Sequence, residues 1–335
     1  MPNFVGGREQ DYNRPFAFFE LEAVLSKVKG SSAGPDMVRY EMLQNLCNSE
    51  KRKLLHFYND VWERREVPSQ WGEAIVIPIL KPGKDPLDPE SYRPIALTNC
   101  VCKIFERMVN NRLLFSLETK GLICPFQSGF RRKRSTLDNV TRLERDVKEA
   151  FSNRRSVVAV FLDMHKAYDM AWRRGILEKL YSLGFRGNLP IFIANLLSDR
   201  TFRVRMGSTF SDLFCQENGV PQGSVLSPTF FMLLINDILS ASSTHIKYAL
   251  YADDIVIWSD AQDLDVAKTE IQKTLDELGR WQDLWGTTFS AEKSNFMVFT
   301  KKRTLSAVHL RIKGVAIPET DPTFFLDLKF DSKLR

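Results

Sequence analysis

The sequence lacks the features of a membrane protein, a secreted disulfide scaffold and a zinc protein. No apolar run approaches the roughly 20 residues needed to cross a bilayer, and the run from Phe230 to Ile235 stops at Asn236-Asp237. The N-terminus opens into polar residues without an apolar h-region, so we expect no secretory signal. There are five cysteines and four histidines, without a CxxC pair or a histidine at zinc spacing. We therefore expect a reduced, intracellular compartment, in the cytoplasm, the nucleus or both.

Composition and charge indicate a folded protein with a polyanionic partner. The 335 residues are 44% hydrophobic and 11% aromatic, which can fill one large core or about two to three modest ones. The net charge is +6, and basic residues cluster, as at Arg131-Arg132-Lys133-Arg134. One such cluster is as often an ordinary solvated surface as a binding site. Several clusters in one chain favour nucleic acid as the partner.

The second half of the chain has a regular order of predicted elements. A β-branched run, Ser156 to Leu162, predicts a buried strand, and a helix is predicted over about 227–239. Alternating apolar runs on both sides of Asp253-Asp254 predict a hairpin, and a long amphipathic helix precedes a last strand from Asn295 to Thr300. Without the insertion before residue 221, the order is strand, helix, strand, strand, helix, strand. This is the order of ferredoxin-like α+β folds.

The predicted topology brings three carboxylates together. In a ferredoxin-like sheet the turn between the second and third strands lies beside the carboxyl end of the first strand. Asp163 follows the first strand, while Asp253 and Asp254 lie at that turn. Adjacent acids repel each other unless solvent or a cation intervenes, and oxygen ligands suit Mg²⁺. The alternative is an acid at a strand end and an unconnected acidic turn.

Short motifs follow one another in a fixed order along nearly the whole chain. In chain order they are SAGPD from Ser32, residues 74–109, FQSGFR from Phe126, FLDMHKAYDMAW from Phe161, GVPQGSVLSP from Gly219, YADD from Tyr251, Lys293-Ser294, and FLDLKFDSKL from Phe325. Each motif is weak alone, but the ordered set is specific. Through these motifs the chain resembles the reverse transcriptases, most closely those of non-LTR (LINE-type) retrotransposons.

The resemblance implies an α+β polymerase right-hand fold with fingers, a ferredoxin-like palm and a truncated thumb. Residues 1–70 would form an N-terminal helical extension and residues 71–155 the fingers. Residues 156–300 would form the catalytic palm, including insertions between fingers and palm. Residues 301–335 would form the primer-grip region and the start of an incomplete thumb, so we expect a fragment or a degenerate copy of an element.

The resemblance also implies a catalytic site. Asp163 and Asp253 would hold two Mg²⁺ ions, for which Mn²⁺ can substitute. Asp254 would belong to the same catalytic and metal site, contributing structure and charge more than an obligatory ligand bond. Lys293 would protonate the leaving pyrophosphate. The alternative for Lys293 is a lysine whose stem lies along the start of a strand.

Four further residues would bind the nucleotide. Lys81 and Arg93 would bind the triphosphate, because Arg grips phosphate as a fork and Lys acts as a point charge. Tyr168 would lie under the incoming sugar, where its ring excludes a 2′-hydroxyl, unless it is a core tyrosine. Gln222 would contact the nucleotide or the templating region from a loop whose Gly223 permits close backbone approach. A simple lead-in to the next helix is the alternative for this loop.

The function implied is that of an RNA-directed DNA polymerase, which adds dNTPs to a primer 3′-hydroxyl by two-metal phosphoryl transfer. Its partners would be an RNA template, a DNA primer and dNTPs, without a membrane and within a larger element-encoded polyprotein. The residues Arg131, Arg132, Lys133 and Arg134 would contact the nucleic-acid backbone without reading its sequence.

Two other functions stay open. Asp327 stands where the family usually has glycine in the primer-grip turn, and a side chain there implies backbone strain. With the incomplete thumb, this substitution favours a catalytically impaired nucleic-acid-binding remnant. An RNA-dependent RNA polymerase is the other alternative, because Asp169 could favour ribose. Tyr168 and the YADD form of the acidic motif argue against that polymerase.

Overall fold

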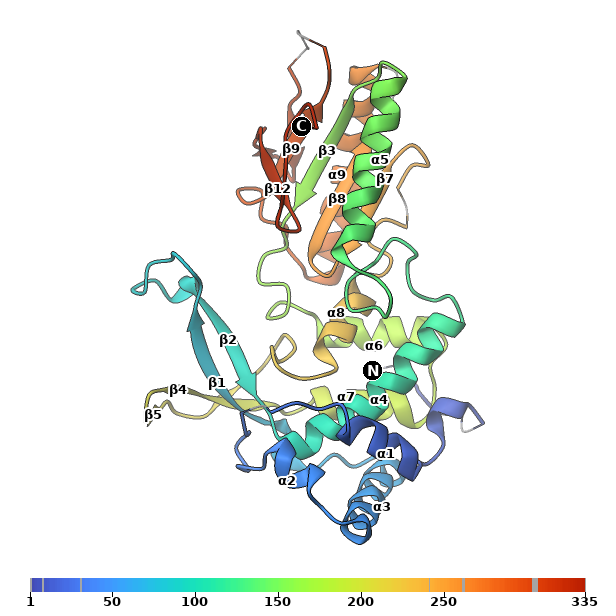
Figure 1. The fold of residues 1–335 in the computed structure, drawn as a ribbon, viewed down its shortest axis with the longest axis vertical. Coiled ribbons are helices and arrows are strands. Elements are labelled where there is room, and N and C mark those ends of the chain that lie inside the picture. The colour runs from blue at the N-terminus through green and yellow to red at the C-terminus, as the bar shows by residue number, and fades with distance from the viewer. Residues whose placement is uncertain are drawn as a thin grey trace. The chain divides into compact units, whose positions relative to one another are not determined.

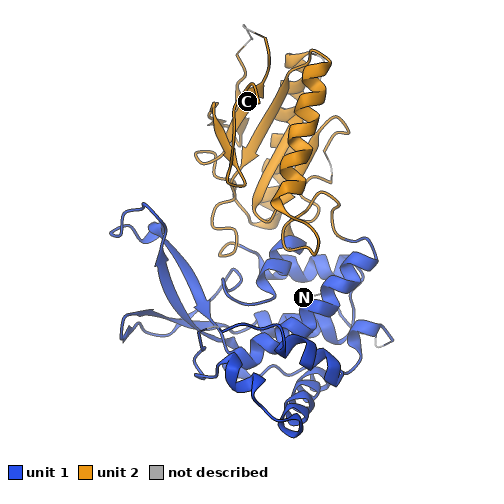
Figure 2. Cartoon of the chain, viewed as in Figure 1, with its two compact units in different colours: residues 1–122, 171–233 blue, residues 123–170, 234–335 orange. Residues whose placement is uncertain are grey.

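The protein is described here from a computed structural model, which covers residues 2–7, 9–30, 32–240, 242–260, 263–302 and 307–334. The chain forms two compact units, each assembled from two stretches of sequence (Figure 2). Unit 1 contains Met1–Leu122 and Ala171–Leu233, and unit 2 contains Ile123–Met170 and Leu234–Arg335. The four consecutive segments expected from the sequence have other bounds, and the division into two units does not test them. They remain a prediction.

Helices make up most of unit 1 (Figure 1), and aromatic side chains pack between them. The helices are α1 (Phe18–Leu25), α2 (Tyr40–Gln44), α3 (Asn48–Arg64), α4 (Cys100–Thr119), α6 (Arg173–Ser182), α7 (Asn188–Leu197) and α8 (Ser227–Leu234), the last of which ends one residue beyond the unit. In the core, the ring of Phe105 stacks on Tyr58 with centroids 4.9 Å apart and meets Phe192 edge-on at 5.0 Å. These rings join α3, α4 and α7.

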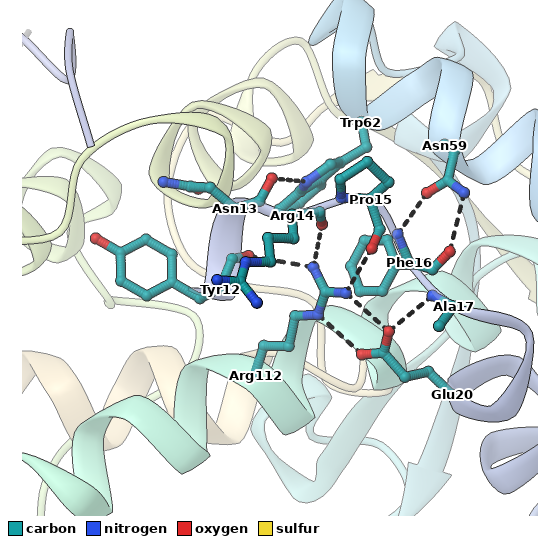
Figure 3. Close-up of polar contacts among 10 residues, drawn as sticks. All are labelled: Tyr12, Asn13, Arg14, Pro15, Phe16, Ala17, Glu20, Asn59, Trp62 and Arg112. Atoms are coloured by element: carbon teal, nitrogen blue, oxygen red, sulfur yellow. Dashed lines mark hydrogen bonds and ion pairs between the residues drawn. The ribbon is translucent and has the colours of Figure 1, made fainter. Parts of the chain in front are cut away.

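Arg112 of α4 fixes the N-terminal segment of unit 1 (Figure 3). Its Nε and Nη2 pair with the Glu20 carboxylate at 2.9 and 2.7 Å. It also donates to the backbone carbonyls of Arg14 and, at 3.0 Å, Pro15. The guanidinium lies 3.8 Å from the centroid of the Phe16 ring. The segment before α1 is thus held by a largely buried, bidentate ion pair.

The sheet of unit 1 is built on a long hairpin. Strands β1 (Glu73–Leu80) and β2 (Tyr92–Leu97) pair antiparallel, and β4 (Thr201–Met206) pairs parallel with β1. The short strands β5 (Thr209–Phe210) and β6 (Phe214–Cys215) pair with β4. The hairpin of β4 and β5 lies in the stretch of chain that precedes residue 221.

Unit 2 contains the ferredoxin-like sheet. Its elements are α5 (Thr136–Ser152), β3 (Val157–Leu162), β7 (Lys247–Tyr251), β8 (Asp254–Ser259), α9 (Leu264–Trp285), β9 (Asn295–Phe299), β10 (Leu310–Ile312), β11 (Val315–Ile317), β12 (Thr323–Phe325) and β13 (Leu328–Phe330). The order across the main sheet is β7-β8-β3-β9. The third strand of the motif, β8, lies beside the first, β3, as the sequence predicts.

Both faces of this sheet are covered. Every side chain of β3 is buried, and alternate residues point to opposite faces. One face contributes Val157, Ala159 and Phe161 to a core shared with α5 and with β12 and β13. Helix α9 packs on β3 and β8, and both α5 and α9 run along the sheet (Figure 1). Because both faces of the sheet are covered, the residues of β3 are apolar along the whole strand.

One predicted helix is shorter than expected. The helix predicted over about 227–239 is α8, and it ends at Leu234. The side chains just beyond it bond to other segments: Asn236 Oδ1 accepts from Cys124 N at 2.8 Å, and Asp237 Oδ1 accepts from Trp281 Nε1 at 3.3 Å. These contacts hold Asn236 and Asp237 in the turns that follow the helix. Within the described residues, no helix is long and apolar enough to span a membrane.

Candidate active site

Strand register places the predicted acids at one edge of the sheet in unit 2. In the antiparallel pair of β3 and β8, Leu162 lies opposite Ile255. The next position along each strand therefore sets Asp163 beside Asp254. Tyr251 pairs with Asp254 across the β7–β8 hairpin, which leaves Ala252 and Asp253 as the turn. The structure thus brings together the three carboxylates that the sequence predicts.

Two of the carboxylates at this edge, Asp253 and Asp254, have raised pKa values. Burial, followed by the charges of Asp253, Asp163 and Asp327, raises the pKa of Asp254 to about 6. Burial also raises the pKa of Asp253. Asp254 nevertheless keeps an exposed surface. Desolvation and like charge both disfavour the ionised form of these carboxyl groups, and a bound cation would stabilise that form.

The carboxylate oxygens at this edge fit a divalent cation that is bound partly by the protein and partly by the protein's substrate. Among the residues that the structure describes, no group of three or more Asp, Glu, His or Cys side chains is arranged as a ready metal site. The oxygens of Asp163, Asp253 and Asp254 are hard ligands, and the mutual repulsion felt by Asp254 shows their proximity. Mg²⁺ typically takes one or two carboxylates and completes its shell with water and phosphate. The residues present fit that mode of binding.

Tyr168 lies near the turn acid Asp253. Burial raises the pKa of its hydroxyl, and the charge of Asp253 raises that pKa further. The residue keeps a partly exposed surface, so it is not a core tyrosine. Its ring therefore belongs to the same edge of unit 2 as the acids.

The loop after α9 holds the backbone of Asp163. Asp163 N donates to Ser294 Oγ at 3.0 Å, and Asp163 O accepts from Ser290 N at 2.9 Å. Lys293 lies between these serines in a turn, with an exposed side chain. The structure therefore brings the Lys293 segment to the acids. Sequence reasoning singled out the lysine and missed the role of the two serines.

Lys81 and Arg93 lie on one face of the β1–β2 hairpin in unit 1. Arg93 is opposite Ile79, and Lys81 N donates to Ser91 O at 2.8 Å. This register makes Lys81 and Arg93 diagonal neighbours, with backbones ~7–8 Å apart. Lys81 Nζ donates to Glu90 O at 2.8 Å, and Arg93 is exposed.

The loop that carries Gln222 is docked on β2. Gln222 O accepts from Ala96 N at 2.7 Å. Gly223 has φ 143°, and a Cβ at this position would lie 2.2 Å from Ala96 O. The predicted close approach of Gly223 is therefore present, and its partner is the backbone of the strand that also carries Arg93.

Glu106 anchors the same loop and was missed in the sequence. This residue of α4 is 1% exposed. Its Oε2 accepts from Ser224 Oγ at 2.6 Å, Val225 N at 2.5 Å and Leu226 N at 3.2 Å. The available signal was an acid inside an apolar helical run, where an unpaired charge is costly.

The basic cluster lies in a loop before α5, not in a helix. Arg131 Nη1 folds back to donate to Cys124 O at 3.2 Å and Gln127 O at 3.0 Å. Its three neighbours are exposed: Arg132, Lys133 and Arg134. Arg131 therefore shapes the loop, and the other three present positive charge to solvent.

Comparison with known proteins gives one consistent result. Residues 79–327 match the family model described as "Reverse transcriptase (RNA-dependent DNA polymerase)". The chain is 31% identical over 94% of its length to "Probable RNA-directed DNA polymerase from transposon BS" of Drosophila melanogaster. It is 30% identical over 94% of its length to "RNA-directed DNA polymerase from mobile element jockey" of the same organism. The match spans 35% of each relative, so the chain corresponds to about a third of their length.

A solved structure supports the fold. Telomerase from Candida tropicalis, in complex with a fragment of telomeric RNA, matches 86% of this chain and 48% of its own chain. The TM-score is 0.55 and the sequence identity is 14%. This similarity is consistent with the right-hand polymerase fold expected from the motifs.

Proposed function

The chain belongs to the reverse transcriptase family, and from this membership we propose that it adds dNTPs to a primer 3′-hydroxyl on an RNA template. The observation that carries the proposal is the sheet edge at which Asp163 lies beside Asp254, with Asp253 in the adjoining turn. The RNA template, the DNA primer and membership of a larger element-encoded polyprotein are parts of this proposal, as is an intracellular location in the cytoplasm or nucleus.

The acids of unit 2 would organise the reacting groups. Asp163 and Asp253 would hold two Mg²⁺ ions, or Mn²⁺ in their place, which supply positive charge at the attacking and leaving oxygens. Asp254 would keep the local potential negative, and its exposed carboxylate would add ligand oxygen where needed. Tyr168 would lie against the sugar and exclude a 2′-hydroxyl. Lys293 would donate a proton to the leaving pyrophosphate.

The residues of unit 1 would bind the nucleotide. Lys81 and Arg93, on one face of the hairpin, would neutralise triphosphate oxygens, and Lys81 would exchange its bond to Glu90 O for one to phosphate. Gln222 would present its amide from the loop docked on β2. Such groups act by positioning and by electrostatic stabilisation, with little covalent chemistry of their own.

The exposed basic loop would bind the nucleic-acid backbone. Arg132, Lys133 and Arg134 carry three adjacent positive charges in the loop just before α5. Phosphate contacts of this kind give affinity without sequence specificity and weaken as salt rises. Arg131, which bonds to the loop carbonyls, would hold the other three in place.

A catalytically impaired remnant is a second candidate, favoured by one observation. Leu326 and Asp327 form the two-residue turn between β12 and β13 with φ of 52° and 64°. Both residues are in the left-handed region, where glycine is preferred and a branched or bulky side chain is strained. The charge of Asp327 also contributes to the raised pKa of Asp254. Asp327, in place of the glycine usual in the family, would weaken DNA synthesis and leave the affinity for nucleic acid unchanged.

Primer extension on poly(rA) with an oligo(dT) primer and dTTP tests the proposal. We expect Mg²⁺-dependent incorporation by the wild type and none by Asp253→Ala. Asp265→Ala, which removes an exposed charge in the same unit, is the matched control and should remain active. Full activity of Asp253→Ala would refute the site. A wild type that binds RNA but incorporates nothing in Mg²⁺ or Mn²⁺ is the remnant, and preference for rNTPs would indicate an RNA polymerase.

A further inference from the structure

Gln127 joins the FQSG segment to the turn that carries Asp253. The residue is 1% exposed. Its Oε1 accepts from Gly129 N at 2.7 Å and from Ala252 N at 3.2 Å. Ala252 is the turn residue immediately before Asp253. One side-chain oxygen therefore ties a remote segment to the backbone of the acidic turn.

The turn needs such a partner because of its backbone conformation. Ala252 has φ 54°, in the left-handed region. A non-glycine residue there is disfavoured by ~1–2 kcal/mol, and tight hairpin turns usually place Gly, Asn or Asp at such positions. Residues persist in this conformation when the surrounding structure over-determines them. The hydrogen bond from Ala252 N to Gln127 is one such determinant.

The backbone around Gln127 reinforces this contact. Strand β7 is at the edge of the sheet, and the segment 126–128 covers that edge. Leu250 N donates to Phe126 O at 3.0 Å, and Ser128 N donates to Leu250 O at 2.8 Å. A Cβ on Gly129 would lie 2.4 Å from Ala252 N, so only glycine allows this approach. The segment is built to reach the turn closely.

The orientation of the Gln127 amide follows from its partners. Two backbone N–H groups face one end of the amide, so this end must be the oxygen. Among the described residues, the buried Nε2 at the other end has no hydrogen-bond partner. A buried unpaired donor destabilises the fold. A contribution to the stability of the fold therefore does not explain why an amide stands here. The hydrogen bonds that its oxygen accepts from Gly129 N and Ala252 N explain it better.

We propose that Gln127 is a positioning residue, which holds Ala252 in its left-handed conformation and thereby sets the direction of Asp253 at the site. The inference deepens the proposed function and depends on it for its catalytic consequence. Gln127 touches no reacting group in this scheme. It acts through the turn backbone.

Gln127→Met tests the inference because it keeps length and apolar contacts, removes the acceptor and deletes the unpaired donor. The matched control is Thr300→Val at the other end of the sheet. Thr300 Oγ1 accepts from Ser156 Oγ at 2.8 Å and from Lys302 N at 3.1 Å, so this variant also loses two hydrogen bonds. Both variants are compared in the full chain.

Hydrogen exchange of ¹⁵N-alanine-labelled protein reads the Ala252 amide directly. We expect exchange at Ala252 about tenfold faster in Gln127→Met, which corresponds to about 1.4 kcal/mol of local opening, and unchanged in Thr300→Val. Unchanged exchange in Gln127→Met overturns the inference. Should Gln127→Met not fold, Gln127→Asn withdraws the same acceptor by one methylene and takes its place.

Primer extension supplies the second readout. Gln127→Met should need a several-fold higher Mg²⁺ concentration for half-maximal activity, with unchanged RNA affinity. Adding Ala252→Gly should restore part of that shift, because glycine adopts positive φ without strain. A general loss of packing would not respond to this second substitution. Faster exchange without a shift in the Mg²⁺ midpoint also overturns the inference.

The two readouts separate this inference from the proposed function. If the wild type incorporates no dNTP, the proposed function fails, while exchange at Ala252 still decides whether Gln127 orders the turn. If the wild type is active and Gln127→Met matches it in exchange and in Mg²⁺ midpoint, the inference alone fails.

Discussion

Neutralising Glu106 should loosen the Gln222 loop while leaving the fold intact. The Glu106 carboxylate accepts three hydrogen bonds from residues 224–226, and two of their donors are backbone N–H groups. Burial lowers the pKa of Arg200, and the charge of Glu106 partly opposes this effect. Glu106→Gln keeps the shape of the side chain and one acceptor oxygen. The variant therefore isolates the contribution of charge.

The expected magnitude follows from these bonds. A hydrogen bond to a charged group contributes ~1.5–3 kcal/mol and a neutral one ~0.5–1.5 kcal/mol, so each bond weakens by about 1 kcal/mol. Three weakened bonds give about 3 kcal/mol, from which relief of the buried charge subtracts. We expect a net loss of ~1–2 kcal/mol in the free energy of unfolding for Glu106→Gln. Glu106→Ala, which leaves buried N–H groups unpaired, should lose ~3–5 kcal/mol.

Urea unfolding and steady-state incorporation of dTTP check this expectation. Because the loop carries Gln222, Glu106→Gln should raise KM for dTTP more than it lowers kcat. Glu118→Gln removes the same charge from an exposed position of α4 and serves as the control. If Glu106→Gln matches Glu118→Gln in both stability and KM, the anchoring role assigned to Glu106 is wrong.

Two other predictions concern the charge at the sheet edge. A pKa raised to about 6 means that folded Asp254 binds protons more tightly than the unfolded chain, so without divalent ions its contribution lowers stability as pH rises from about 4 to 7. In urea unfolding at pH 5 and pH 7.5, Asp254→Asn should flatten this dependence; an unchanged slope contradicts the assignment. Asp327→Gly should relieve the turn backbone and remove one source of the shift, so the acid limb of the pH–rate profile should move to lower pH. An acid limb that stays in place would show that Asp327 does not act on the site.

The sheet and its acids could be predicted because their pattern is periodic. A short apolar run ending in Asp163 and two alternating runs around Asp253-Asp254 define strands from the sequence alone. The ferredoxin-like order then places the third strand beside the first, and the observed pairing of Leu162 with Ile255 follows it. The diagonal placement of Lys81 and Arg93 has the same origin in strand register.

The end of α8 could not be read from periodicity. Apolar residues continue past Leu234, whereas the structure ends the helix there and bonds the side chains of Asn236 and Asp237 to other segments. The bounds of the two units also depend on how distant stretches pack. These outcomes arise from partners that a single stretch of sequence does not contain.

Gln127, Glu106 and Ser294 show why the supporting residues were missed. Each accepts a hydrogen bond from a backbone N–H in a segment far away in sequence: Ala252, Val225 and Asp163 respectively. Every residue except proline offers such a donor, so the partner has no sequence signature of its own. Pattern therefore reveals the side chains that carry charge to the site. The residues that hold those side chains in place can be identified only once the fold shows which backbone N–H group lies beside each of them. Each one therefore has to be tested by a substitution that removes its acceptor alone.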